Sequence, residues 1–283
     1  MKVIDQTLLE KVMIERSRTS HKGDYGRLLL LGGTYPYGGA IIMAALAAVK
    51  SGAGLVTVGT DRENIPALHS HLPEAMAFSL QDQQLLKEQL EKAEVVLLGP
   101  GLRDEAYGEN LVKQVYADLR QNQILIVDGG ALTILARTSL SFPSNQLILT
   151  PHQKEWEKLS GIAIEKQNED ATASALTSFP QGMILVEKGP ATRIWQAGQS
   201  DYYQLQVGGP YQATGGMGDT LAGMIAGFAG QFQQASLYER VVVATHLHSA
   251  IAQELSQENY VVLPTEISHE IPKMMKKISQ KGT

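Results

Sequence analysis

The fold is decided by the stretch Thr214-Gly215-Gly216-Met217-Gly218-Asp219-Thr220, which continues directly as Leu221-Ala222-Gly223-Met224-Ile225-Ala226-Gly227-Phe228. Apolar residues in the second part recur at i, i+3, i+4 and i+7, which predicts one apolar face of an α-helix. Three glycines therefore stand where this helix begins. The first N–H groups of a helix have no partner inside it, and with the positive end of the helix dipole they form an anion site.

Asp219 is the one carboxylate in this glycine-rich turn, and it allows two interpretations. A carboxylate beside an anion pocket repels a phosphate unless it has a chemical task, such as accepting a proton. The other interpretation is structural, because aspartate is a common helix N-cap and the glycines then form an ordinary loop. The spacing favours neither, so the rest of the chain must decide between a base and a cap.

The composition limits the class of protein. The chain has 283 residues, a net charge of −5 and 43% hydrophobic residues, which fits a single α/β domain over residues 1–283. With no cysteine, a disulfide framework, a thiolate zinc site and a cysteine nucleophile are all excluded. The mild acidity and the lack of a basic tract argue against a nucleic-acid polymer as partner.

The start of the chain does not resemble a targeting segment. Residues 1–10 carry Asp5 and Glu10 and have no apolar core, so they do not indicate a signal peptide. The longest apolar stretches are interrupted by glycine or charge and fall short of a membrane span. We therefore expect a cytoplasmic protein that has no membrane partner.

Short apolar strands alternate with helical stretches along most of the chain, which predicts a parallel sheet covered by helices on both faces. A helix is expected over Gly38 to Lys50, and an antiparallel pair over Ala191 to Ile194 and Tyr202 to Val207, with its turn at Gly198. The expected parallel strands are Arg27 to Leu31, Leu55 to Val58, Glu94 to Leu98, Ile124 to Val127, Gln146 to Leu149 and Met183 to Val186.

Most of these strands end in glycine or proline beside a polar residue. In open α/β sheets, ligands bind beyond the carboxyl ends of the strands. Each of these turns taken alone is most simply a plain connection, but several at one edge indicate a site. The residues expected to meet at this edge are Gly33, Gly101, Asp128, His152 and Lys188.

The two commonest nucleotide loops are absent from the sequence. There is no G-x-x-x-x-G-K-[ST] motif, and the first strand leads into Gly32-Gly33-Thr34-Tyr35-Pro36 rather than G-x-G-x-x-G. Neither a P-loop nor a Rossmann fingerprint therefore explains the glycines.

Several segments resemble a known family. The segment Gly215 to Gly223 resembles the anion hole of the ribokinase-like superfamily. Between about residues 20 and 255, further segments resemble, in order, the ADP/ATP-dependent NAD(P)H-hydrate dehydratases. These segments are His21-Lys22-Gly23-Asp24-Tyr25-Gly26, Leu31-Gly32-Gly33, Gly38-Gly39-Ala40, Gly99-Pro100-Gly101-Leu102, Leu149-Thr150-Pro151-His152-x-x-Glu155 and Lys188-Gly189-x-x-Thr192.

The resemblance implies a fold and an activity. The fold is a ribokinase-like three-layer sandwich with a mostly parallel central sheet covered by helices on both faces. The activity is a hydro-lyase reaction that repairs the S epimer of hydrated NADH or NADPH. ADP (or ATP) with Mg²⁺ phosphorylates the hydroxyl on ring carbon 6, and elimination then restores NAD(P)H with release of AMP and phosphate. Phosphate leaves far more readily than hydroxide, which explains the phosphorylation.

The resemblance also implies roles for individual residues. Asp219 is the general base, and the helix end favours its ionised form. The N–H groups of the anion hole hold the charge that develops on the transferred phosphoryl group. The anion hole is Gly216, Met217 and Gly218; the nucleotide-binding residues are Lys188, Gly189, Pro190, Ala191, Thr192 and Gly218; the substrate-binding residues are Ala40, Gly101, His152 and Asp219.

Some of these residues keep a simpler alternative. His152 can hydrogen-bond a neighbouring carbonyl, Glu155 can be an ordinary acid at a helix start, and Lys188 can be a surface lysine. Asp128 can be a turn residue or can help hold Mg²⁺ through water. The sequence leaves the metal ligands unknown.

Assembly and rival functions complete the expectations. The resemblance implies a homo-oligomer, with a tetramer as one form, and Val241 to Ala252 fits an interface or an internal helix equally well. No fused epimerase domain fits before residue 20, so the chain is expected to handle one epimer and to need an epimerase partner, or spontaneous epimerisation, for the other. The rival functions are a small-molecule kinase of the same superfamily, acting on a vitamin precursor or sugar alcohol, and a nucleotide-sensing binding protein.

Overall fold

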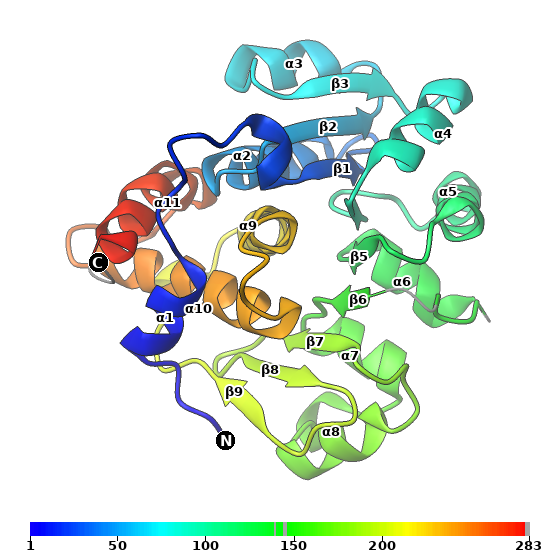
Figure 1. The fold of residues 1–283 in the computed structure, drawn as a ribbon. Helices are drawn as coiled ribbons and strands as arrows, with labels where there is room; N and C mark the ends of the chain where they lie inside the picture. Colours follow the sequence, from blue (N-terminus) through cyan, green and yellow to red (C-terminus); the bar gives the residue numbers. More distant parts are fainter. Residues whose placement is uncertain (139, 144–145, 281–283) are drawn as a thin grey trace.

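The computed structural model describes residues 1–138, 140–143 and 146–280, and within them one nine-stranded sheet runs through the molecule (Figure 1). The strands are β1 (Arg27–Leu31), β2 (Leu55–Thr60), β3 (Met76–Ser79), β4 (Val95–Leu98), β5 (Ile124–Val127), β6 (Gln146–Leu149), β7 (Ile184–Glu187), β8 (Arg193–Gln196) and β9 (Tyr202–Gln204). The helices are α1 (Gln6–Val12), α2 (Gly38–Lys50), α3 (Asn64–His71), α4 (Gln83–Lys92), α5 (Ala106–Asp118), α6 (Gly130–Arg137), α7 (Gln153–Ser160), α8 (Glu169–Leu176), α9 (Met217–Gly230), α10 (Leu237–Leu255) and α11 (Pro264–Ser279).

The strand order is β3-β2-β1-β4-β5-β6-β7-β8-β9, and β1 to β7 are parallel. This confirms the predicted parallel sheet, with β1, β5 and β6 at their predicted bounds. β8 and β9 pair antiparallel, as predicted, about a turn that contains Gly198 at φ +88°. The sequence analysis placed β8 two residues too early and extended β9 too far, and it missed β3 entirely.

The sheet separates two apolar layers. Alternate residues of each strand point to opposite faces, so Leu28 and Leu30 pack with α1, α2, α9, α10 and α11, while Leu29 and Leu31 pack with α4 to α8. Figure 1 shows α2, α9 and α10 on one side of the sheet and α5, α6 and α7 on the other. The predicted three-layer α/β sandwich is therefore confirmed.

The carboxyl ends of the parallel strands β1, β4, β5, β6 and β7 lie side by side. Hydrogen bonds join the turns that follow these strands: Gly33 N–H donates to the Pro100 carbonyl at 2.8 Å, and Lys188 N–H to the Pro151 carbonyl at 2.9 Å. The predicted edge of polar strand ends is thereby formed, and it positions the site described below.

The helix α10 is largely buried within the fold. Twelve of its residues are buried in this one molecule, including Val241 and Ala252. The alternative of an internal helix is thus confirmed for the segment that also fitted a subunit interface. No helix in the described part of the chain combines the length and the apolarity that crossing a membrane requires.

Candidate functional site

The helix α9 begins with a glycine in the left-handed region. Gly216 is the N-cap, with φ +94°, and Met217 is the first helical residue. The positive φ requires glycine here, and a Cβ would also press on the flexible thioether of Met43 on α2. Asp219 is the third residue inside the helix, which shows that its interpretation as the N-cap is wrong.

A buried ion pair faces this helix start. Lys188 Nζ donates to Asp128 Oδ1 at 2.8 Å, and Thr150 Oγ1 donates to the same oxygen at 2.6 Å. Asp128 is 2% exposed, so its carboxylate is fixed at the end of β5. A Cβ on Gly218 would lie 3.1 Å from Lys188 Nζ, which places the ammonium directly over the first turn of α9. Lys188 is therefore not a surface lysine, and Asp128 is more than a turn residue.

The charges around Asp219 tune its protonation. Burial raises the pKa of Asp219 to about 7, the charge of Asp128 adds to that rise, and Lys188 opposes it. The sequence analysis expected the helix end to favour the ionised form. Burial and the neighbouring carboxylates outweigh the helix end, so the carboxyl exchanges its proton near neutral pH.

Glu155 is a second buried carboxyl at this edge. It closes a capping box at the start of α7, where His152 N–H donates to Glu155 Oε2 at 2.8 Å. Burial raises the pKa of Glu155 to about 7, while Lys188 opposes the rise. Glu155 is thus an acid at a helix start, as its simpler alternative predicted, but it also belongs to the charge cluster of Asp128, Lys188 and Asp219.

His152 caps α7 rather than bonding a carbonyl. Its Nδ1 accepts the N–H groups of Lys154 and Glu155 at 3.1 and 3.2 Å. Burial and the charge of Lys188 lower the pKa of His152, which keeps the ring neutral. Its side chain is 57% exposed, so the remainder of the ring faces the open edge of the sheet.

A cavity of about 550 Å³ opens beside the ammonium of Lys188 and the first turn of α9. Its lining combines polar groups, among them Lys188, Gly189 and Gly218, with apolar side chains such as Leu205 and Val207. A site that combines an ammonium with apolar surface suits a nucleotide, which carries both phosphates and a base. The remaining lining residues are Pro190, Thr192, Gly208, Gly209, Pro210, Gln212, Ala213, Met217, Leu221, His248 and Ser249.

The segment predicted to bind nucleotide folds as a tight turn between β7 and β8. The hydroxyl of Thr192 accepts from Gly189 N–H at 3.3 Å and donates to the Gly189 carbonyl at 3.0 Å. Ala191 lies outside the cavity and lines a neighbouring hollow with Arg193. The structure therefore places Lys188, Gly189, Pro190 and Thr192 in the cavity wall and leaves Ala191 apart.

Two of the residues predicted to bind substrate, Ala40 and Gly101, contact each other where the turn after β4 meets α2. A Cβ on Gly101, which has φ +64°, would stand 2.9 Å from the Cβ of Ala40. One turn further along α2, Met43 contacts Gly216 at the start of α9. Ala40 and Gly101 thus pack against each other one helical turn from the anion hole.

A family model described as NAD(P)H-hydrate dehydratase matches residues 28–273 of this chain. The chain belongs to the NAD(P)H-hydrate dehydratase family. It is 90% identical over 280 residues to the ADP-dependent (S)-NAD(P)H-hydrate dehydratase of Streptococcus pneumoniae, over 99% of this chain and 97% of that relative.

Solved members and neighbours of the dehydratase family share the fold. A ribokinase-like superfamily protein of Enterococcus faecalis is 41% identical with a TM-score of 0.94, over 99% of this chain and 96% of that one. The dehydratase of Bacillus subtilis, co-crystallised with ATP and Mg²⁺, is 27% identical with a TM-score of 0.84, over 97% of both chains. These comparisons confirm the ribokinase-like fold predicted from the anion hole.

The sequence analysis gave no role to two residues of this candidate site. Thr150 fixes Asp128, and its place between a strand end and Pro151 was a usable signal. His248 lines the cavity from α10, where burial lowers its pKa to about 4 and its Nε2 finds no hydrogen-bond partner among the described residues. Nothing in the sequence marks this residue, because α10 is separated from the strand ends along the chain.

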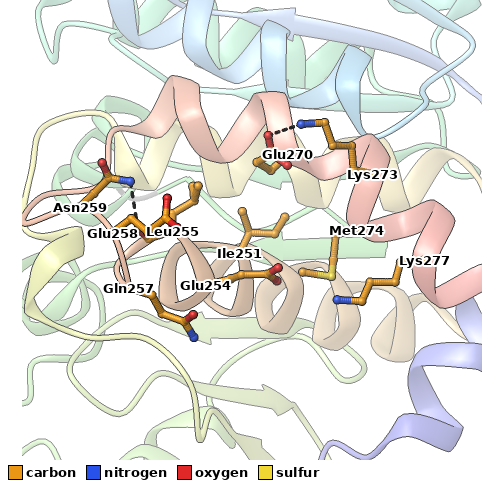
Figure 2. Close-up of a pocket in the computed structure, with 10 residues that line it drawn as sticks. All are labelled: Ile251, Glu254, Leu255, Gln257, Glu258, Asn259, Glu270, Lys273, Met274 and Lys277. Atoms are coloured by element: carbon orange, nitrogen blue, oxygen red, sulfur yellow. Dashed lines mark hydrogen bonds and ion pairs between the residues drawn. The ribbon is translucent and has the colours of Figure 1, made fainter.

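A second hollow, of about 430 Å³, lies between α10 and α11 (Figure 2). Ile251, Leu255 and Met274 form its apolar part, and the ion pair of Lys273 with Glu270 stands on the α11 side. It contains none of the residues at the strand ends. This hollow is therefore separate from the residues predicted to form the site.

Proposed function

We propose that this chain catalyses the ADP-dependent dehydration of the S epimer of hydrated NADH or NADPH. The reaction restores NAD(P)H and releases AMP and phosphate. The observation that carries the proposal is Asp219, a largely buried carboxyl with a pKa of about 7, set in the first turn of α9 beside the ammonium of Lys188. A proton acceptor and a phosphate site thus occupy one helix end.

The first step is phosphoryl transfer to the substrate. The hydroxyl on ring carbon 6 gives its proton to Asp219 as its oxygen attacks the terminal phosphorus of ADP. The bond from that phosphorus to the bridging oxygen breaks, and AMP leaves. The N–H groups at Gly216, Met217 and Gly218, together with Lys188, stabilise the negative charge on the transferred group.

The second step is elimination. The lone pair of the ring nitrogen expels phosphate from ring carbon 6, and loss of one proton from ring carbon 5 restores the double bond. Ala40, Gly101 and His152 hold the dinucleotide in this proposal. Ala40 and Gly101 let it approach the backbone closely, and the neutral, exposed ring of His152 offers it a hydrogen bond.

Magnesium fits as a companion of the nucleotide. No three His, Asp or Glu side chains in the described residues gather as a metal site, and Asp128 is already engaged by Lys188 and Thr150. Mg²⁺ is commonly held by phosphate oxygens, waters and few carboxylates. When bound with ADP, it neutralises phosphate charge, and the described side chains supply the base and the anion hole.

The test is a recovery assay. Purified protein is incubated with hydrated NADH, Mg²⁺ and ADP, and the absorbance of reduced nicotinamide is followed while phosphate and AMP are measured. We expect absorbance recovery with one phosphate per NADH. A stable phosphorylated product would instead indicate the rival small-molecule kinase, and nucleotide binding without turnover would indicate the binding protein.

The family also supports proposals about the domain content, assembly, location and partner enzyme of this chain. We infer that residues 1–283 act as one domain, that the protein is a cytoplasmic homo-oligomer such as a tetramer, and that an NAD(P)H-hydrate epimerase supplies the S epimer. Light scattering tests the assembly. Adding an epimerase to a mixture of both epimers tests the partnership, because recovery then rises from the S fraction towards completion.

A further inference from the structure

Three tyrosines in the segments that follow β1 and β4 are exposed. Tyr35 is 77% exposed, Tyr37 57% and Tyr107 42%, and we call these three residues the tyrosine lip. Asp61 lies near two of them, because its carboxylate accepts Tyr35 N–H at 2.8 Å and its charge, after burial, raises the pKa of Tyr107. Exposed rings of this size are a common feature of binding surfaces.

The backbone beneath the lip is rigid. The turn after β1 and the turn after β4 are joined through Thr34, which is 5% exposed. Its N–H donates to the Gly101 carbonyl at 2.9 Å, its hydroxyl donates to the same carbonyl at 3.1 Å, and that hydroxyl accepts Arg103 N–H at 2.8 Å. Rings held on such a frame lose little conformational entropy when a ligand stacks on them.

Contacts made by successive turns of α2 connect the lip to the anion hole. Tyr37 is the N-cap of α2, Ala40 stands three residues later against Gly101, and Met43 stands three residues after that against Gly216. Residues three apart are neighbours on a helix surface. The rise of 1.5 Å per residue separates Tyr37 from Met43 by about 9 Å along the axis.

We propose that Tyr35 and Tyr37 stack against the adenine ring of the hydrated dinucleotide while its hydrated ring reaches Asp219. This inference rests on the proposed function. Adenine is the flat aromatic part of the substrate, whereas hydration removes a double bond from the nicotinamide ring and its planarity with it. Ala40 carries only a methyl group and Gly101 no side chain, so the linking ribose and phosphate groups can pass close to the backbone beside them.

The experiment compares two substrates that differ only in the adenine half. Wild type, Tyr37→Ala, Tyr35→Ala and Tyr37→Phe are assayed with hydrated NADH and with hydrated reduced nicotinamide mononucleotide. For each alanine variant we expect kcat/KM with hydrated NADH to fall about tenfold, as the loss of one stacked base implies. The mononucleotide should be unaffected, and Tyr37→Phe should retain wild-type values because the ring remains.

A matched control and a second measurement keep the outcomes distinct. Tyr260 is fully exposed and lies outside the lip, so Tyr260→Ala should change neither substrate. If the mononucleotide turns over too slowly, its inhibition constant against hydrated NADH replaces kcat/KM. Equal losses with both substrates, or an altered oligomeric state of the alanine variants in light scattering, would overturn the stacking. A wild type inactive on hydrated NADH would instead overturn the proposed function.

Discussion

At the scale of single residues, replacing Asp219 tests catalysis separately from ADP binding. Asparagine keeps the size of the side chain and removes its ability to accept the hydroxyl proton. Because general-base catalysis contributes about 100-fold or more, we expect Asp219→Asn to lose at least that factor in kcat. ADP binding, measured by calorimetry, should persist because the N–H groups of α9 and Lys188 remain. Normal turnover by Asp219→Asn would show that the base is elsewhere.

The same residue predicts a pH profile. The proposed base must be deprotonated, and the pKa of Asp219 in the free protein is about 7. We therefore expect kcat/KM to rise about tenfold per unit below pH 7 and to level off above it. The measurement is initial-rate kinetics from pH 5.5 to 8.5. A profile flat across pH 7 would contradict the protonation of Asp219 as the controlling event.

Two glycines of the same loop offer a matched pair. A Cβ on Gly218 would stand 3.1 Å from Lys188 Nζ and displace the ammonium from the phosphate position, whereas a Cβ on Gly215 would meet nothing within 4 Å. We expect Gly218→Ala to weaken ADP binding about tenfold, the effect of losing a single charged hydrogen bond. Gly215→Ala should bind ADP as the wild type does, and equal effects would contradict the placement of Lys188.

At the scale of elements, the close approach of α2 and α9 depends on glycine. A Cβ on Gly223 would overlap the carbonyl oxygen of Ala44, so Gly223→Ala must push the helices apart. Such overpacking costs about 1–3 kcal/mol. We expect a corresponding fall in the free energy of unfolding by urea. Gly39→Ala is the control, because a Cβ there meets nothing within 4 Å and alanine favours the helix by up to about 1 kcal/mol.

The sequence predicted elements well where apolar residues recur in a run. The run Leu28 to Leu31 is apolar at every position, as expected for a strand in a sheet that helices cover on both faces. β3 was missed because Met76 to Ser79 is a short edge strand with an exposed methionine. β8 starts late because Thr192 is needed in the turn with Gly189. A helix that is apolar on all sides, such as α10, fits the interior of the fold and a subunit interface equally well. Only its packing in the folded chain distinguishes these two positions.

At the scale of the whole molecule, the fold assembles a charge cluster that sequence patterns do not reveal. Asp128 and Lys188 follow the ends of β5 and β7, and Glu155 and Asp219 lie in the first turns of α7 and α9. The sequence places Asp128 and Lys188 near one edge, because parallel strands share their direction. It does not give the contact of Lys188 with Asp128, the burial of Glu155 or the rise in the pKa of Asp219, since these depend on neighbouring turns in the folded chain.

This cluster predicts how the stability of the whole protein changes with pH. Folding raises the pKa of Asp219 from 3.8 to about 7 and that of Glu155 from 4.5 to about 7. Between pH 4 and about 7 the folded protein therefore holds protons at these sites that the unfolded chain has released. Their contribution to the free energy of unfolding is full below pH 4 and is lost as the pH rises through 7.

Removing one of these carboxyls isolates the effect. Asparagine at 219 cannot ionise, so Asp219→Asn should gain stability relative to wild type between pH 5 and pH 8, even though it loses turnover. The measurement is the difference in Tm between variant and wild type at the two pH values. Asp118→Asn, at an exposed position at the end of α5, should show the same difference at both. If the Asp219→Asn difference is also independent of pH, the buried carboxyl does not destabilise the fold, and activity and stability do not compete at this helix end.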